Sequence, residues 1–246
     1  MIFPAMLAAA PARIPENGDE KWATVRGQIV FDGDVPQPNG IVDRNGKPLR
    51  QVQNWIIHPK TKGVKNVFVW ISSDADKAGM RMPIDLIHPD LRKVPKNTIE
   101  IDNTDMEYTT HSIGARHGQS LTFKNTSTEA VNLRYQGLVL SGNLLIMVGK
   151  DHTIAELKAE AVPLILNDTL HPWMRGYVRV FEHPYFAVTD ENGRFEISLV
   201  PTGKMRLFLW HPETGYRDGA AGRKGDPIEV KSRQFNVGAI SIKPVP

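Results

Sequence analysis

The stretch "FAVTDENGRFEISLVPTGKMRLFLWHP", residues 186–212, decides the fold class. Apolar and polar residues alternate on both sides of Asp190-Glu191-Asn192-Gly193, and a period of two is typical of strands with one buried face. Because Asn-Gly supplies the positive φ that a tight turn requires, we expect a hairpin between residues 186–189 and 194–199. Pro201-Thr202-Gly203 predicts the next turn, and a further alternating strand follows it.

Similar strands are predicted along most of the chain. Residues 22–31 alternate in the same way, and residues 64–72 form a more continuous apolar run that predicts a buried strand. Short alternating segments then recur up to residue 181, separated by turn residues. The best helical segment, residues 152–162, is short and predicts one or two turns at most. The sequence therefore predicts an all-β protein.

The composition indicates a globular chain and excludes several classes of function. The 246 residues are enough for one large domain or two ordinary ones, and the net charge of +3 comes without a block of Lys and Arg. We therefore expect no nucleic-acid partner. No apolar run reaches the ~18 residues of a membrane span, so no transmembrane segment is predicted. The absence of cysteine excludes disulfides, thiolate nucleophiles and iron–sulfur clusters.

The first residues, "MIFPAMLAAAPARIPENG", contain a short apolar run and an Ala10-Pro11-Ala12 that could serve as a signal-peptidase site. A basic segment before the apolar run is missing. Residues 1–21 are therefore either the remainder of an export signal or a disordered N-terminus. We expect a periplasmic or extracellular protein.

The phrase "TDENGRFEISLVPTGKMRLFLWHPETGY", residues 189–216, resembles the second half of a carboxypeptidase regulatory-like (transthyretin-like) β-sandwich. The segments "RGQIVFDG" and "KNVFVWI", residues 26–33 and 65–71, match the first half of such a domain. More than a hundred residues separate the two halves, which predicts an insertion, because closing a longer surface loop costs little. The predicted parts of the sandwich are residues 22–83 and 183–246, and the predicted insert is residues 84–182.

The insert resembles the cupredoxin-like domains of the planctomycete and methylamine-utilization type, most clearly in "HPWMRGYVRVFEHPYFAVTDENGRFEI", residues 171–197. The resemblance implies a Greek-key sandwich inserted in or packed against the first sandwich. It also implies a copper site of two His, one Cys and one Met. In this chain Val131 stands at the first His position and Asp168 at the Cys position, so only His171 and Met174 are retained. Since a type 1 site depends on the Cu–thiolate bond, we expect no blue copper centre.

Two interpretations of the remnant stay open. Asp168 and His171, with Met174 or His111, could hold copper or zinc in a remodelled type 2 site, and His117 and His152 are further possible donors. Alternatively, Pro172 stiffens a structural turn in which Trp173 and Met174 pack and the His171 imidazole is hydrogen-bonded to a carbonyl.

Three hypotheses of function follow. The first is a non-enzymatic exported protein without a cofactor, whose degenerate cupredoxin domain serves as a structural or interaction module for a protein partner. No catalytic residue is predicted, because the chain lacks a G-x-S-x-G elbow, a phosphate-binding loop and an H-E-x-x-H motif. The second is the remodelled copper or zinc protein. The third, a carbohydrate or cell-wall binding module, rests on fold analogy alone.

Overall fold

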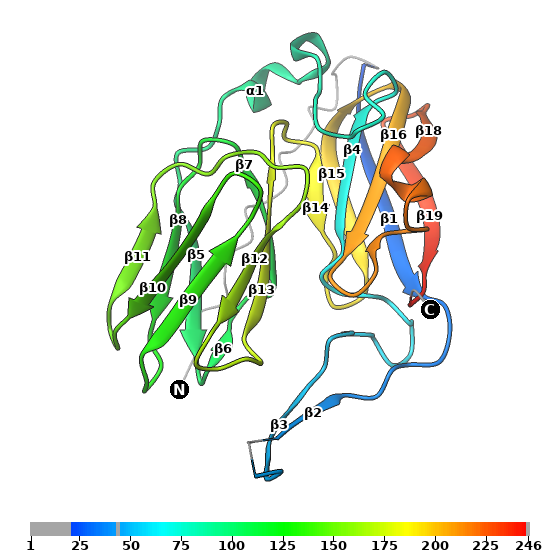
Figure 1. Ribbon diagram of the computed structural model, residues 1–246. Helices are drawn as coiled ribbons and strands as arrows, with labels where there is room; N and C mark the ends of the chain where they lie inside the picture. Colours follow the sequence, from blue (N-terminus) through cyan, green and yellow to red (C-terminus); the bar gives the residue numbers. More distant parts are fainter. Residues whose placement is uncertain (1–20, 43–44, 245–246) are drawn as a thin grey trace, which may run out of the picture.

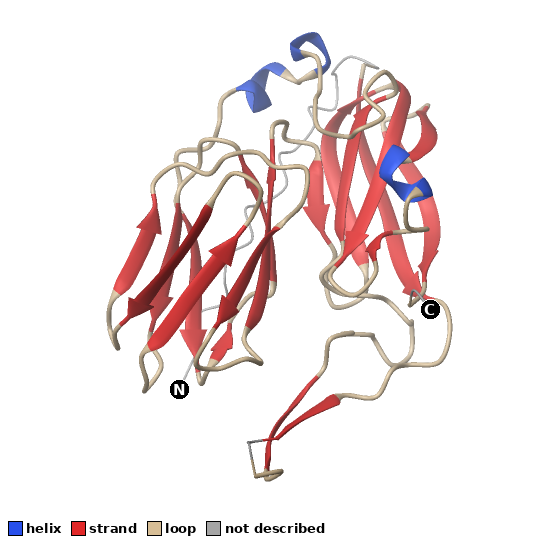
Figure 2. Ribbon diagram, viewed as in Figure 1, coloured by secondary structure: helices blue, strands red, loops and turns tan. Residues whose placement is uncertain are grey.

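The computed structural model describes residues 21–42 and 45–244 (Figure 1). Its regular structure is almost entirely strand, with three short helical turns (Figure 2). The predicted all-β class is therefore confirmed, whereas the predicted signal remnant lies outside the described residues except for Lys21. No helix among the described residues is both long and apolar enough to cross a membrane.

The chain begins with β1 (Trp22–Phe31), β2 (Asn39–Val42), β3 (Pro48–Val52) and β4 (Phe68–Ser73), followed by the helical turns η1 (Ile84–Leu86) and α1 (Pro89–Arg92). The next nine strands are β5 (Ile99–Thr104), β6 (Glu107–Tyr108), β7 (Ser112–Arg116), β8 (Leu121–Asn125), β9 (Val131–Gln136), β10 (Ser141–Ile146), β11 (Asp151–Ile154), β12 (Leu164–Asp168) and β13 (Arg175–Phe181). The C-terminal part contains β14 (Phe186–Val188), β15 (Arg194–Pro201), β16 (Gly203–His211), β17 (Gly215–Tyr216), η2 (Ala221–Lys224), β18 (Asp226–Val230) and β19 (Gln234–Ile242).

The first sandwich combines strands from both ends of the chain. One sheet has the order β15-β1-β19, and the other has the order β14-β4-β16-β17, with β18 also paired to β16. Alternate residues of β1 and β15, such as Val25 and Ile197, meet Val69 and Leu207 from the second sheet in one buried core. The two halves that the sequence separates by more than a hundred residues therefore share a single core.

Strands β5 to β13 form a second sandwich, drawn in green in Figure 1. Its sheets have the orders β10-β9-β12-β13-β7 and β11-β8-β5-β6, with a core of their own. In the chain this unit lies between β4 and β14, which pair directly through Trp70 and Phe186. The division of the chain at residues 84 and 182 stays a prediction. Strands β5–β13 of the second sandwich all lie between these two residues, and the strands of the first sandwich all lie outside them.

The two sandwiches meet along one face of β13. Its alternate residues Tyr177, Arg179 and Phe181, together with His183 beyond its end, lie on the side opposite the insert's core. The guanidinium of Arg179 lies 4.9 Å from the ring centroid of Trp70 and 5.4 Å from that of Phe181. We call this contact layer the seam.

The seam explains why β4 is apolar without alternation. Val69 and Ile71 face the core of the first sandwich, whereas Phe68 and Trp70 belong to the aromatic cluster at the seam. All six residues of β4 are buried, as its continuous apolar pattern predicts. The same sheet thus has a core on each side.

Gly114 on β7 is required by the same packing. A Cβ at this position would lie 2.6 Å from the ring of Phe186. That ring is stacked on Phe181, with 4.3 Å between the centroids, so it cannot move aside freely. The missing side chain lets β7 approach β14 across the seam.

The predicted hairpin over residues 186–199 is wrong. β14 pairs with β4 and β15 pairs with β1, so the intervening turn connects two different sheets of the sandwich. The turn chemistry itself is as expected: Gly193 has φ +72°, and Asp190 Oδ1 accepts hydrogen bonds from the amides of Asn192 and Arg194. Alternation predicts the strands and not their partners.

The helical turns predicted for residues 152–162 are also wrong. β11 occupies Asp151–Ile154, and the chain then continues without a helix. Leu157 is fully buried in the insert's core, and its amide donates to the carbonyl of Gln119. Tertiary burial and pairing with β8 therefore override helix propensity in this segment.

Two buried histidines, His183 and His211, predict a pH dependence of stability. Burial, followed by the charge of Arg116, lowers the pKa of His183 to about 3, and burial lowers the pKa of His211 to about 3. An unfolded His titrates near pH 6.5, so below that pH the unfolded state binds protons that the folded state refuses. Each His therefore contributes stability that is present above pH ~6.5 and is lost as the pH falls toward 3, by up to about 1.4 kcal/mol per pH unit.

We expect His183→Gln to reduce the fall in the free energy of unfolding between pH 6 and 4, measured by urea titration. His211, which stacks on Trp55 in the first sandwich, should give a similar reduction when it is replaced in His211→Gln. In the double variant the two reductions should be additive. A slope that is unchanged in His183→Gln would contradict this account of the buried imidazole.

Candidate functional site

The loop between β12 and β13 contains three of the four predicted metal ligands, and Asp168 organises it. Asp168 ends β12, and its side chain is fully buried. Oδ1 accepts hydrogen bonds from the amides of Leu170 at 2.6 Å and His171 at 3.0 Å. Such an Asx turn is a local device for closing a loop, because the carboxylate replaces backbone acceptors that the turn lacks.

The buried charge of Asp168 is also felt in the insert's core. Burial, and after it the charge of Asp168, raises the pKa of Tyr108, which is itself nearly inaccessible. Two buried polar atoms here have no hydrogen-bond partner among the described residues: Asp168 Oδ2 and His171 Nδ1, which lie 3.4 Å apart. They are close enough for an ion pair with a protonated imidazole, but their geometry is not that of a hydrogen bond.

The other nitrogen of His171, Nε2, lies near the side chain of Glu129. Nε2 lies 3.5 Å from Oε2 of Glu129, whose side chain is 68% exposed. Glu129 belongs to the turn between β8 and β9, and no motif distinguishes it in the sequence. The two carboxylates approach opposite nitrogens of one ring, so Asp168 cannot join Glu129 around a cation bound at Nε2. Asp168 lies on the Nδ1 side of the ring, away from such a cation.

Met174 and the backbone close the loop from the core side. The Met174 side chain is 2% exposed and packs in the insert's core. Its amide donates to the carbonyl of His171 at 2.9 Å, and its carbonyl accepts from the amide of Asp168 at 3.3 Å. Trp173 donates from Nε1 to the carbonyl of Met106 at 2.9 Å. Val131, at the expected position of a His ligand, is buried in the same core.

His111 lies in a different environment. With Trp173, Arg175, Tyr177 and the opposing Glu213 it lines a small hollow of about 50 Å³ between the sandwiches. Burial lowers the pKa of His111 more than the nearby Glu107 raises it. In the described part of the chain, no hydrogen bond or ion pair joins His111 to Asp168 or His171.

The structure thus brings together Asp168 and His171, with Met174 buried below them, and leaves His111 apart. The further donors His117 and His152 contact Ala159 and Tyr135, away from this loop. Within residues 21–42 and 45–244, no group of three or more His, Asp or Glu side chains is arranged to hold a metal ion. What the arrangement offers is one largely buried imidazole with a single exposed carboxylate beside it.

Comparison with known proteins gives a limited likeness. No family model and no curated protein matches the chain. Among solved structures, a Cu(I) form of an amicyanin variant is 22% identical, with a TM-score of 0.31 over 36% of this chain and 86% of that one. The purple cupredoxin from Nitrosopumilus maritimus is 14% identical, with a TM-score of 0.29 over 33% of this chain and 98% of that one. Because both TM-scores are below 0.5, these matches assign no activity, metal or partner to this chain.

The geometry predicts the consequence of removing the Asp168 carboxylate. We expect Asp168→Ala to lower the free energy of unfolding by about 2 kcal/mol, because two loop amides lose a charged acceptor and a buried space is left. Asp168→Asn should cost clearly less, because its side-chain oxygen can still accept both bonds. Urea unfolding of the two variants against the parent chain measures the difference. Equal stability of Asp168→Ala and the parent would show that the loop does not depend on this carboxylate.

Proposed function

We propose that this chain is a non-enzymatic, exported interaction module: a cupredoxin-like sandwich without a type 1 copper site, inserted in a transthyretin-like sandwich. The single observation that carries the proposal is the state of Asp168. The residue at the thiolate position has its carboxylate inside the protein, committed to the amides of Leu170 and His171. The loop is thereby closed by the chain's own hydrogen bonds and does not need a metal to hold it.

The strand orders support the assignment of both sandwiches. In the insert, sequence neighbours are distributed over two sheets that each mix parallel and antiparallel pairs, such as β13 with β7 and β12 with β13. This arrangement is expected of a Greek-key sandwich with a cupredoxin-like topology. In the first sandwich, eight strands form two sheets over one core. The transthyretin-like assignment rests on this architecture together with the sequence phrase at residues 189–216.

A direct test measures metal content after equilibrium dialysis against Cu(II) and Zn(II), followed by elemental analysis. We expect clearly less than one equivalent of either metal to remain after washing, because two protein donors at most approach one point. One tightly held equivalent per chain in the parent would overturn the proposal. The identity of the metal would then be read from the same analysis.

The interaction role is supported by an apolar rim around His171. Leu145, Met147, Val148 and Leu170 are each at least half exposed. Leu145 lies opposite Asn132 in the β9–β10 pair, and Asn132 in turn contacts Thr169 beside Leu170. The turn that follows β10 carries Met147 and Val148 to the same end of the sandwich. Exposed apolar side chains grouped in this way mark interaction surfaces more often than scattered ones.

Substitutions on the rim test this role. We expect Met147→Lys with Leu170→Lys to abolish co-purification of a partner from an extract of the native host, since a charge in an apolar contact is not compensated. The matched control is Leu138→Lys with Val139→Lys, two similarly exposed apolar residues in the loop at the opposite end of β10. Loss of the partner in both variants, or in neither, would contradict a docking role for the rim.

A second candidate function is favoured by the position of Glu129. His171 Nε2 and Glu129 could form the protein part of an open copper or zinc site, with the Asp168 carboxylate on the other side of the ring. In that case the metal retained in dialysis should be lost in His171→Ala and reduced in Glu129→Gln. Metal retention that is unaffected by His171→Ala would exclude this site and would point elsewhere on the chain.

A further inference from the structure

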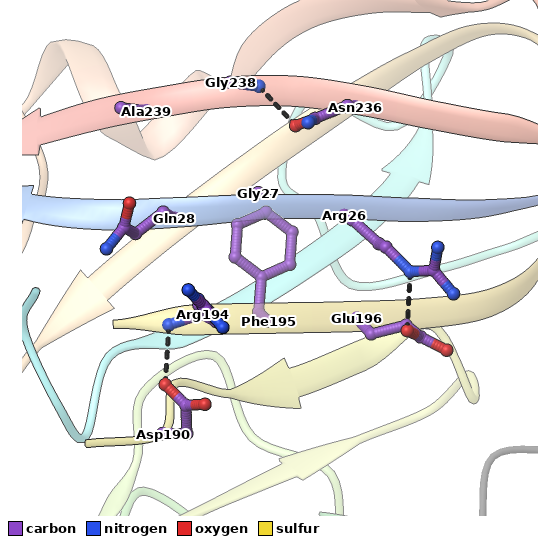
Figure 3. Close-up of a pocket in the computed structure, with 10 residues that line it drawn as sticks. All are labelled: Arg26, Gly27, Gln28, Asp190, Arg194, Phe195, Glu196, Asn236, Gly238 and Ala239. Carbon is purple, nitrogen blue, oxygen red and sulfur yellow. Dashed lines mark hydrogen bonds and ion pairs between the residues drawn. The ribbon is translucent and has the colours of Figure 1, made fainter. Parts of the chain in front are cut away.

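A hollow lies on the outer face of the first sandwich, whereas the loop at His171 belongs to the insert. The hollow covers the sheet β15-β1-β19 and has a volume of about 550 Å³, within the range of small-molecule sites. Figure 3 shows its lining residues, which come from all three strands and from the turn before β15. Nothing in the proposed interaction role of the insert uses this face.

A bulge in the edge strand β19 places small residues at the base of the hollow. The pairing of β1 with β19 shifts between Arg26, opposite Asn236, and Gln28, opposite Ala239. Gly238 lies in the bulge with φ +77°, and a Cβ there would meet no atom within 4 Å. Small residues therefore form the floor and longer polar side chains form the rim. Bulges of this kind often adjoin binding sites because they redirect side chains.

The rim is rich in hydrogen-bond donors whose orientation is set by other contacts. Arg26 donates from Nε to Glu196 at 2.6 Å, which leaves its terminal nitrogens available (Figure 3). Asn236 Oδ1 accepts from the amide of Gly238 at 2.8 Å, so the NH₂ of Asn236 is available to donate. The guanidinium of Arg194 makes no ion pair or hydrogen bond with any described residue.

The rim also offers acceptors. Gln28 donates from Nε2 to the carbonyl of Asn192 at 2.8 Å, which leaves its Oε1 free to accept. Residues two apart along a strand are separated by about 7 Å. The side chains of Arg26 and Gln28, which are two apart on β1, could therefore contact neighbouring groups of one ligand. Planar amides and guanidinium groups suit paired hydroxyls and carboxylates, both of which present two polar atoms together.

The character of the lining selects among ligands. Phe195 is 5% exposed and packs inward, so no aromatic face is available for stacking a neutral sugar. Two carboxylates, Asp190 and Glu196, also line the hollow. Glu196 is paired with Arg26, and Asp190 accepts hydrogen bonds from the amides of Asn192 and Arg194, so the guanidinium of Arg194 is the charged group of the lining that lacks a side-chain partner. We propose that this hollow binds an acidic saccharide, with its carboxylate on Arg194 and its hydroxyls on Asn236, Gln28 and the outer nitrogens of Arg26.

Calorimetric titration and amide NMR with tetragalacturonate test the proposal. We expect saturable binding with a Kd of about 1 mM or below. Shifts should be concentrated in residues 26–28, 194–196 and 236–239. Neutral tetragalactose should bind at least tenfold more weakly, because the carboxylate contact is lost. The insert's loop at 168–174 should not shift, so this result is independent of the metal and partner experiments.

Variants distinguish a site from general charge attraction. Arg194→Met should weaken tetragalacturonate binding at least tenfold, because the ligand carboxylate loses its cation. Folding should be unaffected, because the exposed Arg194 side chain makes no hydrogen bond or ion pair with any described residue. Arg134→Met, which removes the same charge from an exposed position on the insert, is the matched control and should bind like the parent. Equal binding by Arg194→Met and the parent would overturn the proposal, as would no saturable binding to the parent. Equal binding of tetraglutamate would overturn the saccharide assignment.

Discussion

The enclosure of Arg179 between the two sandwiches is the constraint on which the rest of the structure depends. Its guanidinium lies against the rings of Trp70 and Phe181, an arrangement that can contribute about 2 kcal/mol when it is removed from water. Burial lowers the pKa of this guanidinium, although Tyr216 and Glu160 oppose the shift. Burying a guanidinium costs free energy unless favourable contacts compensate for the lost water. Arg179 finds these contacts with Trp70 of the first sandwich and Phe181 of the insert, so the seam favours one fixed arrangement of the two sandwiches.

The seam leaves a different exposed surface on each of the two sandwiches. The insert turns one sheet face to the first sandwich, so its free loops are left at the ends, and the loop at His171 is at one of them (Figure 1). The first sandwich buries β4 and β16 on both sides, which leaves the outer face of β15-β1-β19 open to solvent. The two surfaces for which we propose roles therefore belong to different sandwiches and have different chemistry: an apolar rim on one and a donor-rich hollow on the other.

The loop at Asp168 shows how one buried carboxylate can close a turn between two strands. A carboxylate can do this by accepting hydrogen bonds from the loop's own amides. Asp168 makes two of these and lies beside the imidazole of His171. Met174 is held by the insert's core and by backbone bonds on both of its sides. Contacts within the protein are therefore enough to account for the shape of this loop.

The sequence by itself determined the all-β class, the buried character of β4, the turn chemistry at Asp190 and Gly193, and the absence of a thiolate, because these depend on residue type and local periodicity. Tertiary structure decided which strands pair, so that β14 joins β4 and not β15. It also decided that residues 152–162 are not helical. It also decided that Glu129 approaches His171 while His111 faces the seam. Alternation tells which side of a strand is buried, but the neighbour it meets is set by contacts between residues far apart in the chain.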